Sequence, residues 1–68
     1  MSVVKVVEII GTSEKGWEDA VKQGVKRASE TIENITGVEV TAVTARVQDG
    51  DLTEYRATMK VAFTVKSF

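Results

Sequence analysis

The sequence predicts an α+β fold of order β-α-β-β, in which a three-stranded antiparallel sheet wraps around one helix. Three observations lead to this prediction. β-branched apolar residues fill positions 3–10, a helical stripe of apolar residues follows, and two strand-like segments then flank the turn sequence QDGD. The chain has 68 residues, and we expect one domain over residues 1–68.

The first strand is predicted by the sequence VVKVVEII at residues 3–10. Side chains alternate between the two faces of a strand. Apolar residues therefore occupy both faces, with Val4, Val6 and Ile10 on one and Val3, Val7 and Ile9 on the other. Both faces of this strand need cover from neighbouring structure.

The helix is predicted by apolar residues that recur at helical spacing over about five turns. The stripe consists of Trp17, Ala20, Val21, Gly24, Val25, Ala28, Ile32 and Ile35. Thr12 or Ser13 is expected to cap the first turn. Gly24 lowers helix stability by about 1 kcal/mol relative to alanine. We expect compensation from a neighbouring element that packs closely against the helix at this position. The sequence NITG is expected to end the helix, with Gly37 at the position that tolerates positive φ.

The second strand is predicted over residues 38–47, and its apolar residues change face midway. Such a change indicates a bulge or a passage into another packing environment. Asp49-Gly50 suits a type I′ hairpin turn. The third strand alternates cleanly, with Tyr55, Ala57, Met59, Val61, Phe63 and Val65 on one face. A right-handed crossover makes the first two strands parallel, so the third strand fits between them.

The lengths of these elements predict an oligomer. Each of the last two strands has about 12 residues and spans roughly 40 Å at 3.3 Å per residue. A helix of about 20 residues spans only about 30 Å. One helix cannot cover that sheet, and a monomer rarely leaves a large apolar patch exposed. The chain has no cysteine and no histidine, so association between copies is the expected source of extra stability.

Composition excludes several classes of function. Without cysteine or histidine, the chain has no zinc site of the usual ligands and no Cys–His or Ser–His catalytic pair. No phosphate-binding glycine motif is present either, so we do not expect an enzyme. The net charge is −1, which argues against a nucleic-acid partner. No signal peptide or membrane-spanning run is recognisable, and we expect a soluble, cytoplasmic protein with no membrane partner.

Four pieces of the chain, taken in order, resemble the dodecin family. They are the opening strand with GTS, the helix in GWEDAVKQGVKRASETI, the segment VEV, and the strand YRATMKVAF. The resemblance implies a hollow homododecamer that binds or stores a small ligand. In this family a flavin such as FMN or riboflavin stacks on a tryptophan that begins the second strand, and a glutamine in the third strand bonds the ring edge.

The resemblance places the tryptophan position on Gly37 and the glutamine position on Arg56. Ligand contacts are therefore expected around Gly37, Val38, Glu39 and Arg56, but flavin binding is expected to be weak or absent. Some family members bind calcium and others bind coenzyme A. A calcium-binding dodecin and a purely structural assembly are thus the alternatives.

Two pairs of charged residues are further candidates. Asp49 and Asp51 flank Gly50 and offer oxygen ligands to a hard cation, although a plain hairpin turn is the favoured interpretation. Arg46 and Arg56 come from facing strands and could line an anion or ligand pocket. The favoured interpretation is a salt bridge at a subunit interface, for example with a glutamate such as Glu39 or Glu54. Trp17 is interpreted as a packing residue rather than a ligand platform.

Overall fold

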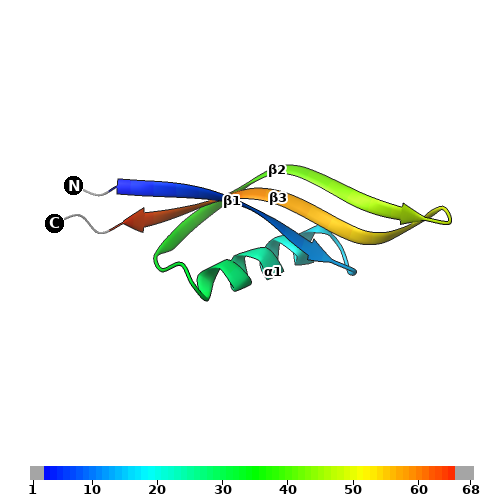
Figure 1. Ribbon diagram of the computed structural model, residues 1–68, viewed down its shortest axis with the longest axis horizontal. Coiled ribbons are helices and arrows are strands. Elements are labelled where there is room, and N and C mark those ends of the chain that lie inside the picture. Colours follow the sequence, from blue (N-terminus) through cyan, green and yellow to red (C-terminus); the bar gives the residue numbers. More distant parts are fainter. Residues whose placement is uncertain (1–2, 66–68) are drawn as a thin grey trace.

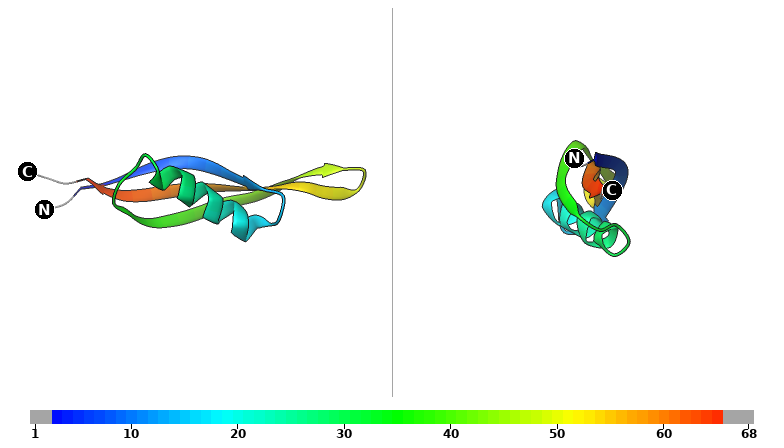
Figure 2. Two further views of the ribbon diagram at one scale, coloured as in Figure 1. Left: turned by 90° about the horizontal axis from the view of Figure 1, so that it is seen from below. Right: turned by 90° about the vertical axis from the view of Figure 1, so that its left-hand side faces the viewer.

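The computed structural model describes residues 3–65 and contains four elements (Figure 1). They are β1 (Val3–Ser13), α1 (Trp17–Ser29), β2 (Ile35–Gln48) and β3 (Asp51–Val65). The strands form one antiparallel sheet in the order β1-β3-β2, so β3 lies in the middle. Figure 2 shows α1 against one face of this sheet. The β-α-β-β fold predicted from the sequence is confirmed, and the opposite side is called the helix-free face below.

The core lies between α1 and the middle strand. Ala57, Met59 and Val61 of β3 are fully buried, together with Ala20 of α1. They alternate along β3, as a strand with one covered face requires. Partly buried side chains surround them: Val7, Ile9, Val21, Val25 and Ile35. No polar or charged side chain is buried within residues 3–65, so the subunit is held together mainly by this small apolar cluster.

Helix α1 and strand β1 touch backbone to backbone at two glycines. A Cβ atom on Gly24 would lie 2.9 Å from Met59 Cε and 3.4 Å from the Cα of Gly11. A Cβ atom on Gly11 would collide with the carbonyl oxygen of Ala20. The predicted close approach at Gly24 is therefore confirmed, and it explains why a glycine is tolerated inside the helix.

The helix is shorter than predicted. It has 13 residues and ends at Ser29, with Glu30 as the C-cap in a right-handed conformation. Gly37 lies inside β2, and it is not among the described residues with positive φ. The prediction that Gly37 ends the helix is wrong, because Asn34, at φ 63°, redirects the chain. Ile35 then pairs with Phe63 in the sheet, so its helical spacing was coincidental.

The helix N-terminus is also built differently from the prediction. β1 continues to Ser13, and the N-cap is Gly16, which makes no side-chain capping bond. The prediction of a Thr12 or Ser13 cap is therefore wrong. Ser13 stabilises the first turn in another way, because its Oγ donates a hydrogen bond to Asp19 Oδ2 at 2.6 Å.

Strand β2 contains the bulge that its sequence pattern indicated. The pairing register shifts between Val40 and Ala42, and there are two further shifts near the ends of the strand. The hairpin that follows has φ 53° at Asp49 and 83° at Gly50. Positive φ at both central residues is the signature of a type I′ turn, so this prediction is confirmed.

Strands β2 and β3 extend past the rest of the molecule. The last pair between β1 and β3 is Ser13–Tyr55, and residues 46–54 continue as a two-stranded hairpin, which we call the arm. The remaining described residues are called the body. Figure 1 shows the arm projecting beyond both β1 and α1. The radius of gyration is 14.0 Å, whereas a compact domain of this length has about 11 Å. The expected overhang of the sheet is thus present.

Candidate functional site

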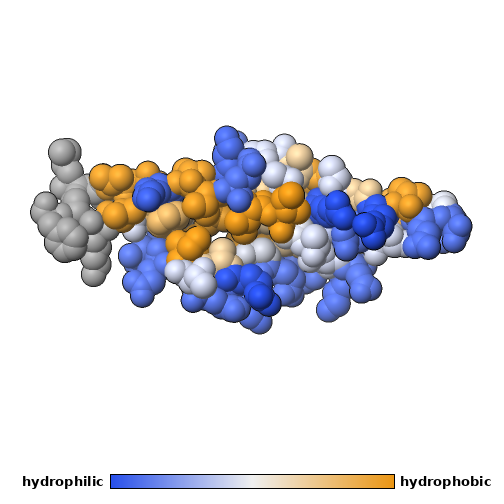
Figure 3. Space-filling view, in the orientation of Figure 1, coloured by the Kyte–Doolittle hydropathy of each residue, from blue (hydrophilic) through white to orange (hydrophobic). Residues whose placement is uncertain are grey.

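The helix-free face exposes the second apolar side of β1. Val4 and Val6 are each 56% exposed and Ile10 is 61% exposed. Figure 3 shows hydrophobic surface extending along the sheet, in contrast to the hydrophilic surface over the helix. The prediction that β1 carries apolar residues on both faces is confirmed, and one of these faces is uncovered in the subunit.

A shallow hollow of about 260 Å³ opens at the start of β2. The cross-strand register sets its lining, because Gly37 lies opposite Ala62 and Glu39 lies opposite Lys60. A Cβ atom on Gly37 would meet no atom within 4 Å. The hollow thus exists because this position has no side chain. Its lining is Val6, Gly37, Val38, Glu39, Lys60 and Ala62.

Three of the predicted ligand residues therefore meet in this hollow: Gly37, Val38 and Glu39. Lys60 was not predicted, although its register with Glu39 follows from the antiparallel hairpin. The ammonium group of Lys60 and the carboxylate of Glu39 are the charged groups of an otherwise apolar recess. Such a recess suits a small, mostly apolar molecule with one or two polar groups.

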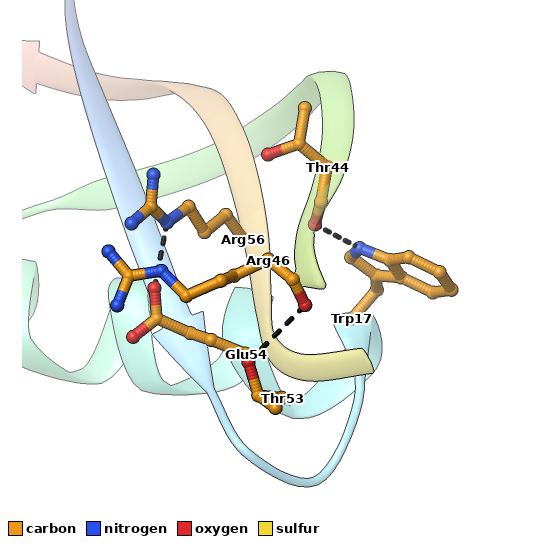
Figure 4. Close-up of polar contacts among 6 residues, drawn as sticks. All are labelled: Trp17, Thr44, Arg46, Thr53, Glu54 and Arg56. Atoms are coloured by element: carbon orange, nitrogen blue, oxygen red, sulfur yellow. Dashed lines mark hydrogen bonds and ion pairs between the residues drawn. The ribbon is translucent and has the colours of Figure 1, made fainter. Parts of the chain in front are cut away.

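The two predicted arginines form a separate group where the body meets the arm (Figure 4). Arg56 Nε donates a hydrogen bond to Glu54 Oε1 at 2.7 Å. Arg46 lies directly opposite Glu54 in the register. The hydrogen bond from Arg56 lowers the pKa of the Glu54 carboxyl, and the charges of Arg56 and Arg46 lower it further, against an opposing desolvation effect.

One carboxylate thus has one bonded guanidinium group and a second that lies opposite in the register, which leaves an excess positive charge. Guanidinium N–H groups that remain free can bind a phosphate or carboxylate group. Arg56 and Lys60 are four residues apart on β3, which corresponds to about 13 Å. The structure therefore divides the five predicted ligand residues into two groups rather than gathering them in one pocket.

The two aspartates lie at the tip of the arm. Asp51 pairs with Gln48, and the turn geometry alone accounts for the glycine between the aspartates. Within residues 3–65, no group of three or more carboxylate, imidazole or thiol side chains is arranged to hold a metal ion. The aspartate pair therefore offers two carboxylates, and the further ligands of a cation would have to come from water or another chain.

Trp17 marks the joint between body and arm. Its indole N–H donates a hydrogen bond to the carbonyl oxygen of Thr44 at 2.8 Å (Figure 4). Its ring meets Tyr55 edge to face, with 4.9 Å between ring centroids and an interplanar angle of 82°. Trp17 thus packs against Tyr55 while 37% of the residue stays exposed, and its interpretation as a packing residue stays a prediction.

No helix within the described part of the chain is both long enough and apolar enough to cross a membrane.

Fold and surface together define a class of protein: a small β-α-β-β subunit with an uncovered apolar sheet face and a projecting hairpin. The family model Dodecin matches residues 3–66. The chain belongs to the dodecin family.

One relative and two solved structures illustrate the match. The calcium dodecin of Mycobacterium tuberculosis is 35% identical over 66 residues, which is 97% of this chain and 93% of the relative. The solved structure of dodecin from Streptomyces davaonensis has a TM-score of 0.93 at 35% identity and covers 97% of each chain. A crystal structure of calcium dodecin from Mycobacterium tuberculosis, described as calcium chelating with a novel calcium-binding site, has a TM-score of 0.82 at 34% identity. The match covers 94% of this chain and 91% of the chain in that structure.

Proposed function

We propose that this dodecin is a non-enzymatic protein that binds or stores a small ligand and assembles into a hollow shell of twelve copies. The observation that supports the assembly is the excess surface of the subunit. Its accessible area is 5110 Å², whereas a compact protein of 7.4 kDa exposes roughly 4200 Å². The excess is comparable to the roughly 800 Å² that each partner buries in a stable interface.

The helix-free face is the candidate ligand surface of this shell. The hollow at Gly37 supplies an apolar recess, and the Arg46–Arg56 group supplies donors for an acidic group, such as a phosphate of FMN or coenzyme A. Flavin binding is proposed to be weak or absent, because Gly37 offers no ring for stacking. Aromatic stacking contributes about 0.5–1.5 kcal/mol per pair beyond the buried area. A cytoplasmic location fits a chain without cysteine.

Light scattering and absorbance of the purified protein test this proposal together. We expect a particle of about twelve subunit masses and no flavin absorbance. A monomer at micromolar concentration would contradict the shell. A yellow protein with stoichiometric flavin would contradict the role given to Gly37.

A pair of variants then tests whether the hollow is a flavin pocket that lacks its platform. Gly37→Trp with Arg56→Gln should gain riboflavin affinity, measured by quenching of flavin fluorescence. The matched control is Gly37→Leu with Arg56→Gln, which fills the hollow without an aromatic face. Equal affinity of the two variants would show that stacking at this position does not control flavin binding.

Calcium binding is the second candidate function, and the similarity to a calcium dodecin favours it. Asp49 and Asp51 are the proposed ligands from this chain. Calcium should raise the melting temperature, and Asp49→Asn with Asp51→Asn should abolish the rise. Glu14→Gln, at an exposed site before the helix, is the control that should keep it. An unchanged melting temperature of the unaltered protein in calcium would remove this candidate.

A further inference from the structure

We propose that the arm of one copy docks in the groove between β1 and α1 of a second copy, so that subunits join head to tail. The inference rests on the proposed assembly and specifies one contact within it. Both halves of this contact are uncovered in the subunit.

The groove has a volume of about 350 Å³ and lies along the free edge of β1. Ile9 and Ala28 are the apolar side chains on the helix side that line it. Gly11 and Gly24, where β1 and α1 come into close contact, also line it. β1 is an edge strand, so its outward backbone groups have no strand partner within residues 3–65. Edges of this kind are natural sites for pairing with another chain.

The arm carries the complementary features. Val47 is 61% exposed and Leu52 is 47% exposed, and together they form an apolar pair just behind the turn. The segment 46–54 contains one basic and three acidic residues, and both aspartates stand at its tip. A two-stranded hairpin by itself is only marginally stable. The arm therefore gains most from a partner that covers its apolar pair and neutralises its tip.

The charge of the groove is opposite to that of the arm. Lys26 and Arg27 form the basic last turn of α1, and Arg27 lines the groove. Among residues 3–65, the ion-pair partner of Arg27 is Glu30, at a long 3.6 Å from Nε to Oε1, with both side chains exposed. Docking places the apolar pair on the apolar side chains of the groove and the aspartates beside the basic turn. Complementary charges of this kind fix the register of an interface.

A second copy must supply the arm, because the chain cannot reach its own groove. Figure 1 shows the arm at one end of the molecule and the C-terminal end of α1 toward the other. The longest dimension of the molecule is 54 Å. A contact between two different surfaces is heterologous, and repeated heterologous contacts close into a ring when their rotation closes. A two-fold contact alone produces a dimer, whereas a shell of twelve copies also needs a contact that links each copy to further copies.

Disulfide trapping tests the contact without background, because the chain has no cysteine. The variant Ala28→Cys with Leu52→Cys places one thiol in the groove and one on the arm of the same chain. Mild oxidation should give a ladder of covalent species that passes the dimer and ends at the size of the ring on a non-reducing denaturing gel, and reduction should return it to the monomer. Glu18→Cys with Leu52→Cys is the matched control, because Glu18 lies on an exposed part of the helix, and it should give at least tenfold less ladder.

A charge exchange gives an independent measurement. Arg27→Asp alone and Asp51→Arg alone should each raise the dissociation concentration of the assembly about tenfold or more. The double exchange should restore it, because the opposite charges meet again. Circular dichroism of each variant shows whether the subunit itself is folded.

The outcomes separate this inference from the proposed shell. If the unaltered protein is assembled but the trapping variant gives no more ladder than its control, the arm docks elsewhere and only this inference is overturned. Covalent species that stop at dimers would overturn the head-to-tail arrangement. If the unaltered protein is a monomer, the shell and this contact are both wrong.

Discussion

The body and the arm are built from the same two strands, yet their environments differ sharply. In the body, β3 buries Ala57, Met59 and Val61 completely under α1. In the arm, every residue except Glu54 is exposed. The strands themselves continue without a break, so local strand propensity does not explain the difference. The difference is that α1 and β1 lie against β2 and β3 in the body but do not reach the arm, because α1 begins at Trp17 and β1 ends at Ser13.

This difference separates two tasks within one sheet. The body provides an apolar core that can hold the subunit fold. The arm contributes no buried side chain to that core and gains stability only where something else covers it. Substitutions in the body should therefore change folding, whereas substitutions in the arm should change association.

The largest expected effect is that of Met59→Ala in the body. Removing a fully buried methionine side chain should lower the free energy of unfolding by about 2–5 kcal/mol. Guanidinium unfolding, followed by Trp17 fluorescence at one fixed protein concentration, measures the loss. The matched arm variant is Leu52→Ala, which should cost less than about 1 kcal/mol in the dissociated subunit. Equal losses would show that the arm belongs to the folding core.

A smaller effect is expected from the glycines. Gly11→Ala forces a Cβ atom against the Ala20 carbonyl, and overpacking of this kind typically costs about 1–3 kcal/mol. Gly37→Ala is the matched control on the helix-free face, where the new atom meets nothing within 4 Å. It should change the free energy of unfolding by no more than about 0.5 kcal/mol. A stable Gly11→Ala protein would mean that α1 shifts away from β1 at little cost.

The sequence predicted the fold well because alternation along the strands is a long, consistent signal. The run from Tyr55 to Val65 in β3 and the Asp49-Gly50 turn each have one reasonable interpretation. The ends of the helix were predicted wrongly for a local reason. Ile32 and Ile35 continue the helical spacing by chance, and Asn34 takes the left-handed conformation that was assigned to Gly37.

The candidate site was only partly predictable for a different reason. The hollow depends on cross-strand register, which brings Lys60 beside Glu39. The hairpin turn sets that register only together with the shifts inside β2, and no local motif gives their exact positions. The same applies to the groove, since Gly11 and Gly24 are separated in sequence and meet only when α1 packs on β1. Single elements follow from sequence periodicity, whereas recesses between elements follow from packing.

A modest effect is expected at the joint between body and arm. Trp17→Phe removes the hydrogen bond to the Thr44 carbonyl but keeps an aromatic ring near Tyr55. The loss should be about 0.5–1.5 kcal/mol, and amide hydrogen exchange should quicken in residues 43–47 more than in the core of β3. Lys22→Ala, on the exposed side of α1, is the control that should change neither. Uniform exchange across the sheet would show that Trp17 does not anchor this joint.

The smallest expected effect concerns two carboxylates, one in the body and one in the arm. The Ser13 hydrogen bond lowers the pKa of Asp19, with smaller contributions from Gln23, Lys15 and Lys22 against a desolvation effect. The pKa of Glu54 is lowered chiefly by Arg56. A carboxyl whose pKa is lowered in the folded state stabilises the fold at pH values above its pKa in the unfolded chain. This stabilisation is lost as the pH falls through its pKa in the folded state. Both contributions should therefore begin to decline near pH 4 and be lost at more acidic pH, below the lowered pKa values of the folded state.

Salt should distinguish the two carboxylates, because a charged partner is screened and a neutral hydroxyl is not. Carboxyl-carbon NMR titrations at low and at molar salt should show the pKa of Glu54 rising further toward its ordinary value than that of Asp19. Ser13→Ala should raise the pKa of Asp19 at both salt concentrations, and Arg56→Gln should do the same for Glu54. If salt moved the pKa values of both groups equally, the pKa of Asp19 would depend on its lysine neighbours rather than on Ser13.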